Sequence, residues 1–521
     1  MMLNFTAPKQ LSLRPYQMDA VEALRDGIRA GQKRQILVAA TGAGKTVIAS
    51  HLLNEADRKG SYALFMVDRV ALVDQTSQTL DDYGINHGIV QGINERWAPN
   101  ENVQVCSVQT LTRRCLPRSP SLIIYDEAHC QYKDTLAYIE ANPQAVAIGL
   151  TATPFTPGMG MFWNRAVNVT TTAQLVKDGF LIEPKIFVAK SPEDAELGLN
   201  NFGEFTDNSA GAAGIRIVGD VVKEWVKKTA EFFGGPAKTI VFSPTVEHGR
   251  ELCAAFSAAG FNFQQISYLD RNEDERKEKI REFRREDSLI HGLVSCGVLT
   301  KGFDVPDVRV GISCKPYRKS LSSHLQEIGR VMRTAPGKDI ALWLDHSGNI
   351  ERFALDQYDV WENGCGDLSH AEKRDATPRK RDQQTHEKVV CPECGGVLRG
   401  NACLACGWEK PARSGIIAVE GELKAFDIAG SALVARSGLR AACLAEPKSV
   451  WNAALCYCLE HSRDQSKARK WAYGVWRGVY PDAKLPTGWF DAAAMEPKAD
   501  AYALVEREIN RFRKNNSRRA A

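Results

Sequence analysis

Ala39-Ala40-Thr41-Gly42-Ala43-Gly44-Lys45-Thr46 stands at the end of an apolar run, residues 36–40, and opens a stretch with helical periodicity. A strand, a glycine-rich turn and a helix in this order are typical of a loop that wraps phosphate groups. Glycines let backbone N–H groups face phosphate oxygens, Lys45 neutralises negative charge, and the Thr46 hydroxyl ligates Mg²⁺. We therefore predict a nucleotide site here. Its expected contacts are Thr41, Gly42, Ala43, Gly44, Lys45 and Thr46.

A second motif, Asp126-Glu127-Ala128-His129, ends the apolar run 122–125, about eighty residues after the first motif. A nucleotide's magnesium ion needs a carboxylate at the end of a strand, and Asp126 supplies one. Hydrolysis needs a base that orients water, and Glu127 is adjacent. The two motifs predict an ATP-hydrolysing site in which Thr46 and Asp126 hold Mg²⁺.

Apolar runs and amphipathic stretches alternate in two successive regions, which predicts two tandem α/β domains with parallel sheets. The expected strands are 36–40, 63–67, 103–107, 122–125 and 145–150, and then 239–242, 289–295, 308–313 and 340–344. The expected units are an ATP-binding domain at 1–165, a connecting segment at 166–210, a second α/β domain at 211–365, a charged linker at 366–388, a cysteine-containing ribbon at 389–411 and a C-terminal region at 412–521.

The two motifs, taken in order, resemble those of the DEAH-type superfamily 2 helicases. Other segments of the chain fall in the family's order: Leu13-Arg14-Pro15-Tyr16-Gln17, Asp68-Arg69-Val70, Ser107-Val108-Gln109-Thr110-Leu111, Thr151-Ala152-Thr153 and Leu299-Thr300-Lys301-Gly302-Phe303-Asp304-Val305-Pro306. Ala39 replaces the usual first glycine, a departure that this superfamily commonly shows. The resemblance covers roughly residues 11–349 and implies two RecA-like domains with ATP and Mg²⁺ between them.

This resemblance also implies roles for individual residues. Gln17 would read the adenine edge. Arg69, Thr110 and Thr300 would contact the nucleic-acid backbone. Gly302 and Asp304 would link that contact to the nucleotide. The residues that would couple hydrolysis to domain movement are His129, Thr151 and Thr153.

A motif of the second domain is expected to complete the nucleotide site. In Gln326-Glu327-Ile328-Gly329-Arg330-Val331-Met332-Arg333, the two arginines are three residues apart and share one face of a helix. Both side chains can therefore point at charge that develops during hydrolysis. By resemblance, Arg330 and Arg333 are arginine fingers, with Arg333 the direct contact, and Gln326 senses the nucleotide.

Four of the 14 cysteines form two pairs, Cys391-Pro392-Glu393-Cys394 and Cys403-Leu404-Ala405-Cys406, separated by eight residues. Four thiolates at this spacing suit a tetrahedral structural zinc ion. We therefore predict zinc ligation by Cys391, Cys394, Cys403 and Cys406. The role of this ribbon stays open between nucleic-acid binding, partner binding and stabilisation of a small unit. Two motor domains followed by such a ribbon resemble the RadD-like branch of bacterial and prophage DNA-repair helicases.

The C-terminal region is basic. Residues 441–521 carry a net charge of +5, whereas the whole chain carries +4. Such a local field attracts phosphate backbones. Tryptophans at 451, 471, 476 and 489 are interleaved with basic residues, and they either stack on bases or pack a small helical core. We favour the helical core.

No apolar run approaches the roughly 18 residues that cross a membrane, and residues 1–14 lack a signal-peptide pattern. We therefore expect a cytoplasmic protein without membrane contact.

The favoured function is an ATP-dependent motor that moves on or unwinds single-stranded, forked or branched DNA, in repair, recombination or phage replication. An RNA helicase, an ATP-switched DNA clamp or adaptor, and the motor subunit of a restriction system stay open. A protein partner of the ribbon or the C-terminal region is also expected.

Overall fold

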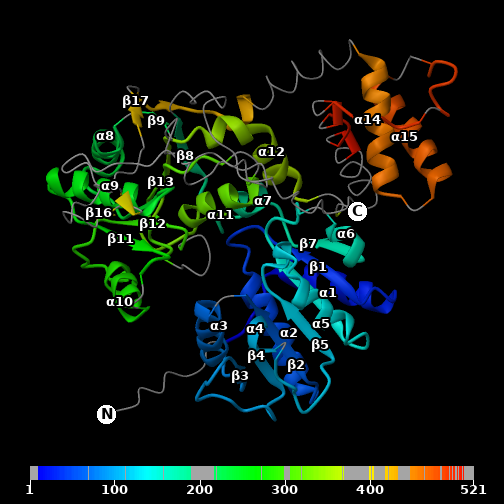
Figure 1. The fold of residues 1–521 in the computed structure, drawn as a ribbon, viewed down its shortest axis with the longest axis horizontal. Coiled ribbons are helices and arrows are strands. Elements are labelled where there is room, and N and C mark those ends of the chain that lie inside the picture. Colours follow the sequence, from blue (N-terminus) through cyan, green and yellow to red (C-terminus); the bar gives the residue numbers. More distant parts are fainter. Residues whose placement is uncertain are drawn as a thin grey trace.

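The computed structural model describes residues 10–188 except 69, 112 and 157, residues 216–218, and residues 220–317 except 271–272 and 299–304. It also describes 320–365, 368, 398–399, 402–403, 417–419, 422–431 and 446–509, the last range without 463, 481–483, 492, 496, 499–500, 503 and 507. Two sheets flanked by helices form the larger part, and a pair of helices, α14 (Pro447–Glu460) and α15 (Gln465–Val479), follows them (Figure 1). The predicted α/β class is confirmed. No helix among the described residues is long and apolar enough to span a membrane.

The first sheet has seven strands in the order β3-β4-β2-β5-β6-β1-β7, and all neighbouring strands are parallel. Its strands are β1 (Arg34–Val38), β2 (Ala63–Val67), β3 (Gly88–Val90), β4 (Val103–Ser107), β5 (Leu122–Tyr125), β6 (Val146–Thr151) and β7 (Arg165–Asn168). The helices around it are α1 (Pro15–Arg29), α2 (Lys45–Arg58), α3 (Val70–Asp82), α4 (Val108–Leu111), the 3-10 helix η1 (Ala128–Cys130), α5 (Lys133–Glu140), α6 (Met159–Phe162) and α7 (Thr172–Lys177).

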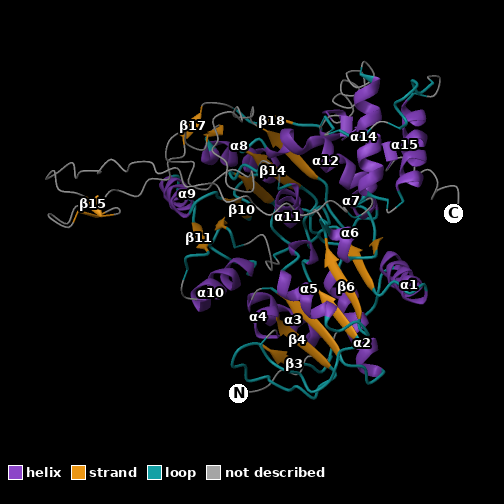
Figure 2. Ribbon diagram, turned by 45° about the vertical axis from the view of Figure 1, so that its right-hand side comes forward, coloured by secondary structure: helices purple, strands orange, loops and turns teal. Residues whose placement is uncertain are grey.

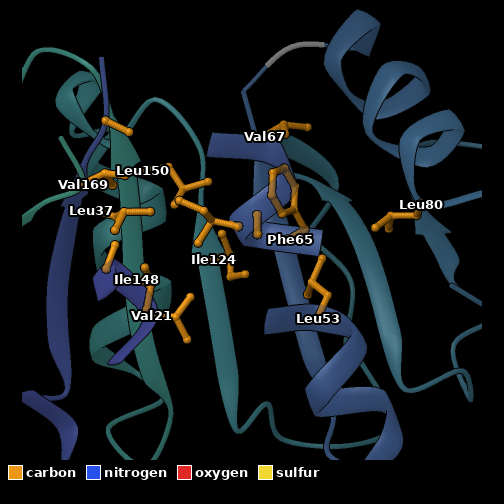
Figure 3. Packing of buried hydrophobic residues seen from close by; sticks show 14 of the residues in the cluster. Val21, Leu37, Leu53, Phe65, Val67, Leu80, Ile124, Ile148, Leu150 and Val169 are labelled. Carbon is orange, nitrogen blue, oxygen red and sulfur yellow. The ribbon is translucent and has the colours of Figure 1, made fainter. Parts of the chain in front are cut away.

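Apolar side chains fix α2 against this sheet. Figure 3 shows the cluster in which Leu37, Phe65 and Ile124 of three strands lie with Val21 of α1 and Leu53 of α2, all of them buried. Alternate residues of the same strands form a second cluster, because successive side chains of a strand point to opposite faces. Burial of each such side chain contributes about 1.5–3 kcal/mol. The start of α2 is thereby held at the carboxyl end of β1.

The second sheet has the order β11-β12-β10-β13-β14-β8-β18 and is parallel except for the last pair. Figure 2 shows the strands of both sheets in orange among purple helices. Its strands are β8 (Pro184–Val188), β10 (Thr239–Phe242), β11 (Phe263–Ser267), β12 (Gly292–Cys296), β13 (Val310–Ser313), β14 (Ala341–Asp345) and β18 (Lys424–Ala425). Its helices are α8 (Val221–Phe233), α9 (Val246–Ala258), α10 (Glu273–Arg284), α11 (Leu321–Val331) and α12 (Asn349–Asn363).

Two strands come from segments that we expected to lie outside the second domain. β8 lies in the segment 166–210, which we expected to be a connection, and it pairs with β14. β18 lies far downstream in the C-terminal region and pairs with β8 in antiparallel orientation. Leu423, beside β18, is buried in the core of this domain. A further short pair, β9 (Arg216–Val218) with β17 (Ile417–Val419), joins the expected second domain to the C-terminal region.

The C-terminal helices pack around tryptophan side chains. Trp451 of α14 and Trp476 of α15 are 3% and 1% exposed, and Trp451 Nε1 donates to the carbonyl of Trp489 at 2.8 Å. The helical-core interpretation of these two tryptophans is therefore confirmed. Lys470 and Arg477 remain exposed on α15.

Within the ribbon, the structure describes residues 398–399 and 402–403. There, β15 (Leu398–Arg399) and β16 (Ala402–Cys403) form an antiparallel hairpin. Cys391, Cys394 and Cys406 lie outside the described residues, so their ligation of zinc stays a prediction.

Candidate nucleotide-binding cleft

The loop between β1 and α2 has the backbone form that a phosphate loop requires. Gly42 and Gly44 have φ angles of 92° and 80°, in the left-handed region that favours glycine. A Cβ atom on Gly44 would lie 2.4 Å from Nε2 of Gln17, so a side chain would also clash. Helix α2 begins directly afterwards at Lys45. Its N-terminal N–H groups and positive dipole end suit a phosphate.

A cavity of about 420 Å³ lies beside this loop, and both α/β domains line it. The predicted residues among its lining are Thr41, Gly42, Gly44, Lys45, Thr46, Asp126, Glu127, Gln326, Arg330 and Arg333. Ala43 and Gln17 are buried, and their predicted contacts with the nucleotide stay predictions. The structure thus brings the phosphate loop, both carboxylates and both arginines to one cleft.

Glu127 is held in a strained conformation beside the phosphate loop. Its φ of 50° is uncommon for a residue other than glycine. Its Oε1 lies 4.0 Å from Nζ of Lys45, and both side chains are largely buried. The Glu127 backbone N–H donates to Oδ1 of Asp126 at 2.9 Å. Both carboxylates therefore lie beside the phosphate loop, and their roles as a magnesium ligand and as a group that orients water stay predictions.

His129 connects Glu127 to the end of β6. Its Nδ1 lies 3.2 Å from Oε2 of Glu127 and 3.0 Å from Oγ1 of Thr151. Burial alone would lower the pKa of His129, but hydrogen bonds to Cys130 and Glu127 outweigh burial and raise the pKa to about 9. The imidazole is therefore protonated near neutral pH and pairs with the Glu127 carboxylate.

A hydroxyl pair joins this network to the second domain. The Thr153 N–H donates to Oγ1 of Thr151 at 3.0 Å, and Oγ1 of Thr153 lies 2.6 Å from Oγ of Ser322 in α11. The same helix carries Arg330. The sequence did not indicate Ser322, because a serine before a helical motif has many ordinary roles.

Helix α11 packs directly on the phosphate loop. A Cβ atom on Gly329 would lie 2.7 Å from Cβ of Thr41, so the two domains approach closely at this point. Gln326 and Arg330 are mostly buried, and Arg333 follows the helix. The charges of the second domain are therefore next to the phosphate loop of the first.

Two family models match the two domains. Residues 10–156 match "Type III restriction enzyme, res subunit", and residues 226–335 match "Helicase conserved C-terminal domain". Both domains therefore match families of the superfamily 2 helicases.

Individual relatives agree with this match. The Schizosaccharomyces pombe protein named as the mitochondrial ATP-dependent helicase irc3 is 28% identical over 66% of this chain and 59% of its own length. The chain thus spans about three-fifths of that relative. The 51.5 kDa protein of a Lactococcus phage is 27% identical over 70% of this chain and 76% of its own length. An HsdR-subunit fragment of a type I restriction enzyme from Vibrio vulnificus covers 69% of this chain and 68% of its own, with a TM-score of 0.54 at 20% identity. This similarity confirms the RecA-like fold of both domains.

The Gln17 side chain forms hydrogen bonds to the phosphate loop and to the start of α1. Gln17 Nε2 donates to the Ala43 carbonyl at 3.0 Å, and Oε1 accepts the Arg14 backbone N–H at 2.9 Å. Nearby, the Arg14 guanidinium lies 3.9 Å from the ring centre of Phe180, and both residues line the cavity. The predicted contact of Gln17 with adenine stays a prediction. Phe180 was not predicted, because no motif surrounds it.

The predicted nucleic-acid contacts are described only in part. Thr110 follows β4, and its Oγ1 accepts the Gly92 N–H at 3.1 Å. The other two predicted nucleic-acid contacts, Arg69 and Thr300, lie outside the described residues. So do Gly302 and Asp304, which were predicted to link those contacts to the nucleotide.

The cleft fits a magnesium ion that arrives with a nucleotide. Thr46 and Asp126 both line it, and Mg²⁺ commonly combines one or two carboxylates with phosphate oxygens and water. Within the described ranges, no three His, Cys, Asp or Glu side chains form a metal-binding group by themselves.

Proposed function

We propose that the chain is a DNA-stimulated ATPase that translocates on DNA or unwinds it. The strongest support is the cavity in which Lys45 and Glu127 of one domain share a lining with Arg330 and Arg333 of the other. A site built from two domains makes hydrolysis depend on how the domains meet. The two domains would close around ATP and reopen after hydrolysis. This movement would shift the nucleic-acid contacts of one domain relative to those of the other.

The residues divide the chemistry among them. Lys45 and the start of α2 bind the β- and γ-phosphates. Glu127 orients the attacking water and accepts its proton. Arg330 and Arg333 stabilise the negative charge that develops on the transferred group. Thr46 and Asp126 would hold Mg²⁺, which would neutralise phosphate charge when bound.

DNA is the proposed substrate for two reasons. The layout of two motor domains, cysteine-paired ribbon and basic C-terminal region resembles RadD-like repair helicases. The first-domain family also takes its name from a restriction enzyme.

We further propose that the four cysteines bind zinc, which the hairpin between the two pairs supports. A role in repair, recombination or phage replication follows from the same resemblance.

A restriction motor is the second candidate, and the name of the first-domain family favours it. In that case, the chain would hydrolyse ATP and translocate while a partner subunit cleaves. Strand displacement by the chain alone would favour the first candidate over this one.

The test is steady-state ATP hydrolysis by the full chain with no nucleic acid, single-stranded DNA, duplex DNA, forked DNA or RNA. The proposal predicts at least tenfold stimulation by one form of DNA and less by RNA. Preference for RNA would indicate an RNA helicase. Hydrolysis that ignores every nucleic acid would contradict the motor and favour a partner-activated clamp.

A further inference from the structure

Lys338 lies in a turn after the arginine motif, beyond residue 335, where the match to the family model ends. It is only 5% exposed. Its Nζ donates to the backbone carbonyls of Val331 at 2.7 Å, Arg333 at 2.7 Å and Pro306 at 2.9 Å. An ammonium group has three N–H donors, so these contacts use all of them.

The three carbonyls belong to two segments that meet at the cleft. Val331 is the last residue of α11, where a positive charge interacts favourably with the helix dipole and caps free carbonyls. Arg333 and Pro306 both line the nucleotide cavity. A single buried side chain therefore fastens the end of α11, the backbone of Arg333 and the segment before β13 to one another.

The opposite side of this segment is held by the chain that connects the two domains. The Ile182 N–H donates to the Met332 carbonyl at 2.7 Å, and Leu181 forms an antiparallel bridge with Arg333. Leu181 itself reaches the phosphate loop, since a Cβ atom on Gly42 would lie 2.6 Å from it. The backbone of Arg333 is thus fixed between the connecting chain and Lys338.

We propose that Lys338 is a positioning residue that holds the backbone of Arg333 where its guanidinium reaches the transferred phosphate. This inference rests on the proposed hydrolysis at this cleft. Misplacement of a charged group by about 1 Å is enough to lower a rate substantially.

The environment of Lys338 supports a specific role. Burial lowers its pKa to about 7; Arg333 and Arg309 add to this effect, while Asp307 opposes it. Asp307 is itself paired with Lys238. A buried ammonium is unfavourable unless its hydrogen bonds are made, and a methionine would fill similar space without that cost. Packing alone therefore does not require a lysine here.

The test compares Lys338→Met with wild type in the full chain, by ATP hydrolysis, ATP affinity and thermal unfolding. We expect kcat to fall at least tenfold while the Kd for ATP changes less than threefold. Lys338→Gln keeps two N–H donors, so its kcat should lie between those of wild type and Lys338→Met. It replaces Lys338→Met in the test if the methionine variant does not fold. Lys223→Met, on the exposed face of α8, is the matched control.

A double-mutant cycle with Arg333→Ala shows whether Lys338 acts through Arg333. Single-turnover hydrolysis is measured so that low rates are resolved. We expect Lys338→Met to change the rate less than twofold in the Arg333→Ala background, because the positioned group is already absent. An equal loss in both backgrounds, or wild-type kcat in Lys338→Met, would overturn the inference. Absence of hydrolysis in the wild type would instead contradict the proposed function.

Discussion

Oγ1 of Thr153 lies 2.6 Å from Oγ of Ser322, and this hydrogen bond joins the two RecA-like domains. On the Thr153 side, the contacts continue through Thr151 to His129 and Glu127. Ser322 belongs to α11, which also carries Arg330, a residue that lines the cleft. The Glu127 carboxylate is therefore connected to the second domain by one path of polar contacts.

Removal of either hydroxyl should weaken the link between the domains. We predict that Thr153→Val and Ser322→Ala each lower DNA-stimulated kcat roughly fivefold, since a hydrogen bond contributes about 1 kcal/mol. The double variant should lose little more than either single one, because the two hydroxyls serve the same contact. Steady-state hydrolysis with saturating DNA measures this effect. Losses that multiply in full would show that the hydroxyls act separately.

Loss of the Lys45 side chain and loss of the Glu127 carboxylate should have different effects on ATP binding. Lys45→Ala is predicted to abolish hydrolysis and to weaken ATP binding, because it removes the charge that holds the phosphates. Glu127→Gln is predicted to lower hydrolysis by about 10²-fold or more while ATP still binds. Binding of a fluorescent ATP analogue, measured beside turnover, distinguishes the two. Normal turnover in either variant would contradict the site assignment.

A buried acid in α11 should make stability depend on pH. Glu327 is 1% exposed and accepts a hydrogen bond from the Tyr317 hydroxyl at 2.6 Å. Burial raises its pKa from 4.5 to about 8, with a smaller opposing effect from Tyr317. The folded chain therefore holds a proton that the unfolded chain releases above pH 4.5. The stability that Glu327 contributes is complete below that pH and declines as the pH rises to about 8.

Glu327→Gln removes this titration but keeps an acceptor for Tyr317. The unfolding free energy of the variant relative to wild type should therefore rise between pH 5 and pH 8, by at most about 1.4 kcal/mol per pH unit. Denaturant unfolding at several pH values measures the difference. If the unfolding free energies of wild type and Glu327→Gln changed with pH in parallel, the folded chain would not hold a proton on Glu327.

Local motifs of this sequence could be interpreted without the structure, but non-local partners could not. The phosphate loop and the strand before Asp126 follow from neighbouring residues, because turn glycines and buried strands leave local patterns. Ser322 and Lys338 were missed, since their roles arise from atoms that only the folded chain brings near. Likewise, β18 is a two-residue strand whose partner lies far upstream, so no periodicity marks it.

The four cysteines of the ribbon should bind one zinc ion per chain. Cys391→Ser combined with Cys394→Ser removes two thiolates, so zinc should be lost in metal analysis of the purified protein. Cys115→Ser, at an exposed free cysteine, is the matched control and should keep its zinc. Full zinc content in the double variant would reject the four-cysteine site.

The shared cleft is tested most directly by Arg333→Ala, with ATP hydrolysis and ATP binding measured on the same preparation in the presence of the most stimulating DNA. Arg250→Ala, at an exposed position of α9, is the control. The account predicts that Arg333→Ala loses hydrolysis by about 10³-fold, the effect typical of an arginine finger, while ATP binding persists. Unchanged hydrolysis in Arg333→Ala would contradict a catalytic site completed by the second domain.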